Sequence, residues 1–296
     1  MADILISALP TWTGTAADLR WFVMNNSGNT ETFKFSGYTS PFRYVSDTLK
    51  NVVSLGTGTN TITSSGGNNL IGGGITNTIS STQLNGVIIG GNINSLINGG
   101  DSNAIIGGFS TTINGSSYCL NQNQGSTITS SANFAMIGGH QNSASGCFEG
   151  GMFGTYASSI VNGTDSTILG GRSNSINAGG ACCGGNQIIG GDTNAINNTP
   201  GSKSTIIGGN ANTIRNTSDR SSIIGGQSNT ISGHTSAIML GCSGRTSTTS
   251  VATFVENLVV FKYASLDYAD DTAAAAGGVV LGQVYHTSGT LKIRIV

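Results

Sequence analysis

The sequence predicts an all-β fold, a parallel β-solenoid of about 12 coils with about 17 residues each and a small cap at either end. Three observations predict this fold. A Gly-Gly phrase returns at regular intervals, as in GGNANTIRNTSDRSSIIGGQSNTISG at residues 208–233. Charged residues make up only 8% of the 296 residues, whereas 46 are glycine. The β-branched segments between the glycines are too short for helices and suit short strands with tight corners.

The residue before each Gly-Gly pair marks one position of the coil, and the mean step between markers is about seventeen residues. The clear markers are Ile71, Ile89, Ile106, Ile137, Leu169, Ile189, Ile207 and Ile224, with Leu55, Leu120, Phe153 and Leu240 as degenerate copies.

A second apolar position follows each marker by about seven or eight residues, which gives two strands per coil. One isoleucine of each Ile-Ile-Gly-Gly phrase should fill the coil and the other should face outward, because neighbouring strand residues point to opposite faces. We expect the core to contain the markers Leu55, Ile71, Ile89, Ile106, Ile137, Leu169, Ile189, Ile207 and Ile224, and the second positions Ile62, Ile79, Ile97, Ile113, Ile160, Ile176, Ile196, Ile214 and Ile231.

Two further regularities fit stacked coils. Asparagine recurs at positions 60, 94, 142, 174, 194, 212 and 229, which predicts a ladder of stacked amides along one edge. Residues 51–250 hold only five acidic and five basic side chains. Like charges at one coil position would face each other one strand spacing apart and destabilise the sheet.

A coil of two short strands has little interior of its own, and a continuous outward apolar stripe calls for a partner. We therefore expect copies of the chain to pack as an intertwined or side-by-side homotrimer. The alternative is a monomeric solenoid with a thicker coil.

The repeat IIGGxxNTI over residues 55–240 resembles the head repeats of trimeric autotransporter adhesins and the related β-rolls of bacteriophage fibres. The segment DYADDTAAAAGGVVLGQVYHTSGTLKIRI resembles a closing module at the C-terminus of many phage fibre and virion proteins. We find no export signal, heptad-bearing stalk or membrane β-barrel anchor of the kind that an autotransporter needs. The resemblance therefore favours a phage fibre over the autotransporter.

Three regions follow: an N-terminal attachment or cap region (1–48), the solenoid shaft (49–250) and a C-terminal tip module (251–296). In the tip we expect Asp270 or Asp271 to cap a helix over 273–276, and a hairpin around Thr-Ser-Gly. The N-terminal region contains a predicted hairpin with aromatic residues that serve either as a start cap or as an anchor to a virus particle. The candidate anchor residues are Trp12, Trp21 and Tyr38.

The sequence points away from an enzyme, a metal protein or a cofactor protein. His140, His234 and His286 fall in different repeat positions or regions, and the five cysteines follow no zinc-ligand spacing. No catalytic, cofactor-binding or metal-binding residue is predicted. One exception stays open: Asp101, Glu149, Asp165 and Asp219 share a predicted column, and two neighbouring carboxylates suit glycoside hydrolysis. An ice-binding face would need Thr-x-Thr in most coils. Thr61 with Thr63 and Thr127 with Thr129 fit, but most coils lack the pattern.

The expected function is that of a structural component of a bacteriophage virion, a trimeric head or tail fibre on the particle surface, made in the host cytoplasm. Expected partners are two further copies, other virion proteins through the N-terminal region, and a host surface glycan or protein for host attachment. A net charge of -1 argues against nucleic acid, and no apolar run is long enough for membrane insertion. The alternatives are a non-viral trimeric surface adhesin and a polysaccharide-degrading tailspike.

Overall fold

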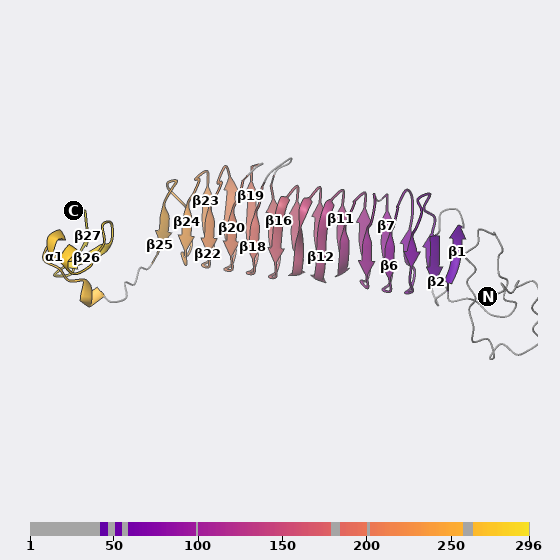
Figure 1. Ribbon diagram of the computed structural model, residues 1–296, viewed down its shortest axis with the longest axis horizontal. Coiled ribbons are helices and arrows are strands. Elements are labelled where there is room, and N and C mark those ends of the chain that lie inside the picture. Colours follow the sequence, from indigo (N-terminus) through magenta and orange to yellow (C-terminus); the bar gives the residue numbers. More distant parts are fainter. Residues whose placement is uncertain are drawn as a thin grey trace, which may run out of the picture.

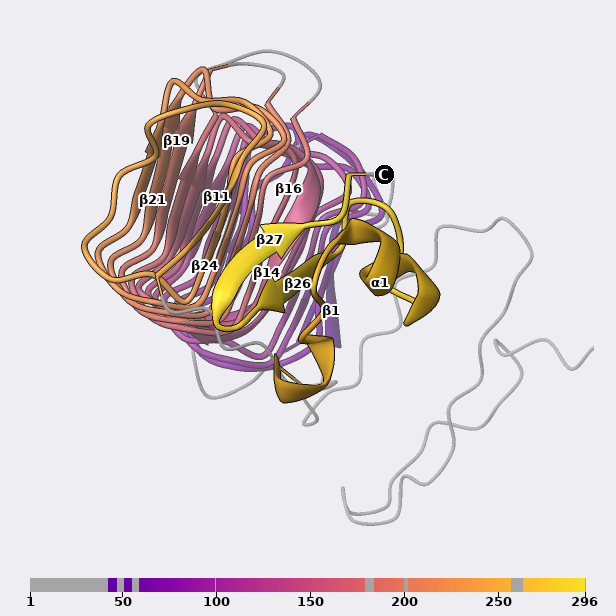
Figure 2. The same cartoon turned by 90° about the vertical axis from the view of Figure 1, so that its left-hand side faces the viewer.

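The computed structural model describes residues 42–46, 51–54, 59–98, 100–178, 184–199, 202–256 and 263–295. It confirms an all-β parallel β-solenoid of about 12 turns with a period of about 16 residues. Figure 1 shows the strands stacked side by side along a rod, and Figure 2 looks along that rod. Of the predicted residues, Leu55, Trp12, Trp21 and Tyr38 lie outside the described ranges.

Two sheets form the walls of the rod, and each coil gives one strand to each sheet. Apart from the antiparallel pair of β1 and β2, the strands within both sheets are parallel. Sheet A contains β1 (Phe42–Ser46), β2 (Asn51–Ser54), β4 (Leu70–Ile71), β6 (Val87–Ile89), β8 (Ala104–Ile106), β10 (Leu120–Gln124), β12 (Ala132–His140), β14 (Phe148–Tyr156), β16 (Thr164–Leu169), β18 (Gln187–Ile189), β20 (Thr205–Ile207), β22 (Ser222–Ile224), β24 (Ile238–Leu240) and β25 (Thr253–Val255). Sheet B contains β3 (Thr61–Ile62), β5 (Thr78–Ile79), β7 (Ser95–Ile97), β9 (Thr112–Asn114), β11 (Thr127–Thr129), β13 (Ser143–Ser145), β15 (Ser159–Val161), β17 (Ser175–Asn177), β19 (Ala195–Asn198), β21 (Thr213–Asn216) and β23 (Thr230–Ser232).

The shaft extends past its predicted end at residue 250. Strand β25 pairs in parallel with β24, with Met239 opposite Phe254. Phe254 packs against the core, so residues 253–255 form a rung of the solenoid and do not belong to the tip.

The core is a double column of side chains, one from each sheet. The second-position isoleucines at 62, 79, 113, 160, 176, 196, 214 and 231 lie in it, and all are at most 3% exposed. Their partners across the coil come from sheet A. These are Val53, Ile71, Ile88, Ile105, Met136, Met152, Ile168, Ile188, Ile206, Ile223 and Met239.

The prediction that the marker residues fill the core is wrong for seven of them. Ile89, Ile106, Ile137, Leu169, Ile189, Ile207 and Ile224 are between 36% and 48% exposed, and the preceding residue is buried instead. The two glycines that follow each of these seven markers have positive φ and turn the chain, so the marker is the last outward-facing residue before the turn. A Cβ on Gly191 would lie 2.4 Å from the carbonyl oxygen of Gly209 in the next coil, and this explains the second glycine.

Two other core predictions depend on local register. Ile71 is buried because it pairs with Ile88 and is followed by three glycines. Ile97 is only half-buried, because the structure pairs Ile79 with Leu96 and gives the core position to Leu96.

The asparagine column lies inside the rod and not along an outer edge. Asn194, for example, is fully buried, and its Oδ1 accepts the N–H of Asn212 in the next coil at 3.0 Å. Its Nδ2 donates to the carbonyl oxygens of Gly208 and Gly209, each at 3.2 Å. The amides therefore bond mainly to backbone groups of neighbouring coils, as buried polar groups must.

The C-terminal tip forms a small unit with its own core of Ala274, Val279 and Tyr285. Its helix α1 (Asp271–Ala276) has the predicted cap, since Asp270 accepts the N–H of Ala273 at 2.8 Å, and it begins two residues before the predicted range. A 3-10 helix (Tyr263–Leu266) precedes it, and β26 (Val284–Thr287) and β27 (Thr290–Ile293) form the predicted antiparallel hairpin.

Candidate interaction surfaces

The outward face of sheet A carries a long apolar stripe. We use that name for Ile89, Ile106, Ile137, Phe153, Leu169, Ile189, Ile207, Ile224, Leu240 and Val255, which occupy equivalent rungs and are interrupted only by Gln122. Ten strand steps separate its ends, a length of about 48 Å at 4.8 Å per step. An exposed apolar surface of this length is typical of an interaction site.

The outward face of sheet B has a different chemistry. Its first outward column is Thr61, Thr78, Ser95, Thr112, Thr127, Ser143, Ser159, Ser175, Ala195, Thr213 and Thr230. Ten of these eleven residues carry a hydroxyl, so this face suits contact with water. The stripe on sheet A and this column on sheet B thus differ in chemistry, one being apolar and the other polar.

A corner of stacked planar side chains follows the Gly-Gly turn. The His140 and Tyr156 rings lie 5.2 Å apart and nearly parallel, with 13° between their planes. The Arg172 guanidinium lies 5.5 Å from the centre of the Tyr156 ring, on the next coil, as a cation-π contact. The rings cover one another, so this corner presents polar edges rather than an open aromatic platform for a sugar.

Sequence reasoning could have found this stack. His140 and Arg172 stand three residues after their markers Ile137 and Leu169, and Tyr156 stands three after Phe153. The phrase Phe-Gly-Thr-Tyr lacks the second glycine of the repeat, which hid the equivalence of Tyr156 with the other two.

The predicted carboxylate column splits into two. Glu149 and Asp165 hold equivalent places on neighbouring coils, since Phe148 pairs with Thr164 and Gly150 with Ser166. Both are exposed and have positive φ. Asp101 and Asp219 stand one position earlier in the coil. The carbonyl oxygens of Asp101 and Asp219 accept the backbone N–H groups of Tyr118 and Ser236. Tyr118 and Ser236 occupy, in the next coils, the position that Glu149 has in its coil.

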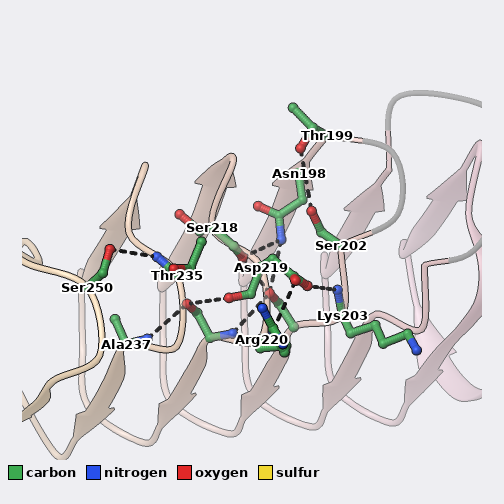
Figure 3. Close-up of polar contacts among 12 residues, drawn as sticks. Asn198, Thr199, Ser202, Lys203, Ser218, Asp219, Arg220, Thr235, Ala237 and Ser250 are labelled. Carbon is green, nitrogen blue, oxygen red and sulfur yellow. Dashed lines mark hydrogen bonds and ion pairs between the residues drawn. The ribbon is translucent and has the colours of Figure 1, made fainter.

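Asp219 has its own partners. Its Oδ1 accepts the backbone N–H of Lys203 at 2.9 Å, and its Oδ2 lies 3.2 Å from Nε of Arg220. Figure 3 shows the Lys203 side chain running away from this carboxylate, so the ammonium group remains at the surface. Asp219 is therefore engaged by Arg220 and by the backbone of Lys203. Glu149 and Asp165 are the two neighbouring carboxylates that remain for acid–base chemistry, and two carboxylates on adjacent coils do not by themselves make an enzyme site.

The other chemistry-bearing groups of the described chain do not converge. No three His, Cys, Asp or Glu side chains within the described ranges could together hold a metal ion. His234 contacts Ser247 at 2.7 Å, and His286 lies 3.3 Å from Asp267 in the tip. Burial raises the pKa of the Cys147 thiol, as it does that of Cys119, which suits inert core residues.

No helix in the described part of the chain is both long and apolar enough to cross a membrane.

No protein-family model matches the chain, and no curated protein matches it either. Among solved structures, the chain is similar to the polySia-specific acetyltransferase NeuO at 12% identity and a TM-score of 0.14. That alignment covers 67% of this chain and 83% of the other. A TM-score this low carries no argument about fold or activity.

Proposed function

We propose that the protein is a structural component of a bacteriophage virion, a trimeric head or tail fibre that projects from the particle and contacts the host surface. The solenoid forms the shaft, the N-terminal region attaches to other virion proteins, and the C-terminal module forms the tip. The assignment to a phage rests on the resemblance of residues 267–295 to closing modules of phage fibres.

The apolar stripe on sheet A carries the proposal of self-association. Each coil already has a buried core of its own, in which side chains such as Ile188 and Ile196 are fully buried. The outward isoleucines are therefore not needed to fill the coil, and exposure of a whole column of them to water is unfavourable. Three copies that turn sheet A toward a common axis would bury the stripe and leave the hydroxyl face of sheet B outside.

The mass of the purified protein, measured by light scattering after size exclusion, tests the trimer. The chain has a mass of 29.9 kDa, so three copies give about 90 kDa. Ile189→Lys should shift the mass to that of a monomer, because it places a charge in the stripe. Asn197→Lys is the matched control, since Asn197 is exposed on sheet B of the same coil and should leave the trimer intact. A wild-type monomer, or equal effects of both variants, would contradict this use of the stripe.

Immunogold labelling of phage particles tests the location. Antibodies against the shaft should label particles at the capsid or the tail, and unlabelled particles would refute the assignment to the virion. A free-standing adhesin would instead be found on a cell surface.

A further inference from the structure

The shaft ends in an open strand edge. Strand β25 is the last strand of sheet A and pairs on one side only, with β24 (Figure 1). The N–H of Ile238 donates to the carbonyl oxygen of Ala252 at 2.8 Å. Successive strand residues direct their backbone groups to opposite sides, so Thr253 and Val255 direct theirs away from β24. In the described part of the chain these groups have no hydrogen-bond partner, and such an edge is a template for a further strand.

The tip has an open edge of the same length. Strand β27 pairs only with β26, and the N–H of Arg294 donates to the carbonyl oxygen of Gln283 at 3.0 Å. By the same alternation, Leu291 and Ile293 direct their backbone groups away from β26, and no described residue bonds to them. The other side of β26 is already covered, because the N–H of Tyr268 donates to it at 2.9 Å. A further strand can therefore join this hairpin only along β27.

The side chains on the two open edges match in an antiparallel pair. With Val255 opposite Leu291 and Thr253 opposite Ile293, every open backbone group of the four residues finds a partner. Directly opposite residues have their side chains on the same face of a sheet. Leu291 and Ile293, which are 55% and 56% exposed, would then continue the outward apolar face of sheet A beyond Val255.

The opposite face of the hairpin carries the tip core. Tyr285 lies opposite Lys292 and packs with Ala274 of α1. In the same antiparallel pair Lys292 would lie opposite Phe254, which is only partly buried at the end of the shaft core. This places α1 and the tip core over the open end of the last coil. A parallel pair would reverse the two faces and put α1 outside the shaft, with only two side chains over the core.

We propose that the tip hairpin adds to sheet A of its own shaft as an antiparallel extension, with Val255 opposite Leu291 and Thr253 opposite Ile293. The joined sheet has the order β24, β25, β27, β26 and ends at an edge that the chain itself covers. Residues 257–262 connect the two units covalently, which raises their effective concentration for each other. The inference holds for any number of copies and does not depend on the assignment to a virion.

Cysteine pairs in the full-length protein test the register. The first variant combines Val255→Cys with Leu291→Cys, whose Cα atoms lie about 5.5 Å apart in a hydrogen-bonded pair, within the range of a disulfide. The displaced control combines Thr253→Cys with Leu291→Cys, about 8–9 Å apart in the same sheet and out of range. The single variants control for links to native cysteines. Mild oxidation, non-reducing gels and mass spectrometry of the linked peptides report the result.

Hydrogen exchange tests the pairing without a disulfide. In the wild-type protein the Val255 amide should be protected, although it points away from β24. Ile293→Pro removes an N–H that points toward β25 and spares the ladder with β26, as proline on an edge does. It should speed exchange at Val255 by roughly tenfold. Leu281→Ser, which changes another exposed aliphatic residue of the tip, is the control and should leave this rate unchanged.

A link within one chain for the first pair, with none for the displaced control, is the expected result. A link only in the displaced control would overturn the register. Links between chains would overturn the assignment to the chain's own shaft, because the copies would then exchange tips. Absence of any link, together with fast exchange of the Val255 amide in the wild-type protein, would overturn the pairing itself.

Discussion

Truncation of one asparagine of the inner ladder is expected to destabilise the whole shaft. In Asn194→Ala the N–H of Asn212 loses its acceptor, and a buried unsatisfied donor costs about 1–3 kcal/mol. The carbonyl groups of Gly208 and Gly209 lose the Nδ2 donor, which adds about 0.5–1.5 kcal/mol. The free energy of unfolding should therefore fall by about 2–4 kcal/mol.

Asn194→Ser is the matched control. The chain itself uses serine at this coil position, where Ser158 Oγ accepts the N–H of Asn174 at 3.2 Å. A serine at position 194 thus retains an acceptor for the Asn212 N–H and loses only the Nδ2 hydrogen bonds to Gly208 and Gly209, which should cost about 1 kcal/mol.

Urea denaturation followed by circular dichroism, at one fixed protein concentration, gives the two free energies. Hydrogen exchange at the Asn212 amide gives a local readout, and it should speed up in Asn194→Ala but hardly in Asn194→Ser. If both variants lose the same stability and the Asn212 amide stays protected in both, the ladder does not hold the coils together as described.

Three more predictions follow from the described contacts. Ile188→Asn should abolish the β-sheet signal in circular dichroism because Ile188 is fully buried, whereas Ile189→Asn should retain it because Ile189 is 38% exposed. Asn121→Leu should raise the free energy of unfolding in urea by about 1–3 kcal/mol, because neither polar atom of this buried amide has a hydrogen-bond partner in the described part of the chain. The hydrogen bond from the Tyr285 hydroxyl to Asp271, together with burial, raises the pKa of Tyr285 to about 12, which carbon NMR of the tyrosine rings can measure. The pKa is higher in the folded chain, so this stabilisation is complete below about pH 10 and is lost as the pH rises toward 12; Asp271→Asn should lower the pKa, and an unchanged value would contradict the assignment.

The repeat made the solenoid predictable, because glycine spacing and β-branched pairs report a period directly. The face of the strand on which each residue lies was harder to predict. The phrase Ile188-Ile189 does not say which isoleucine is buried, and only the turn geometry at Gly190 and Gly191 decides it. A one-residue error reverses the face of every side chain in a strand, which is why the marker prediction failed as a set.

The candidate surfaces were predictable only in part, for a related reason. Glu149 and Asp165 stand sixteen residues apart and were correctly placed on neighbouring coils. Asp101 was placed one position out, because coil lengths vary between 15 residues, from Asn121 to Met136, and 20 residues, from Ile168 to Ile188. When equivalent positions are assigned with one fixed period, such variation displaces the assignment by a residue or more.

The two outer faces of the shaft serve as an internal comparison for the argument about self-association. Both sheets stack parallel strands rung by rung over a buried inner column, so folding alone makes similar demands on their outward residues. Sheet B meets these demands with serine and threonine, which shows that this fold tolerates polar residues at an outward strand position. Sheet A places an apolar residue at nearly every equivalent rung of the stripe. Strand propensity does not account for the difference, since threonine is also a favourable strand residue. The apolar stripe therefore answers a requirement from outside the coil, and burial against neighbouring copies, as proposed above, would meet that requirement.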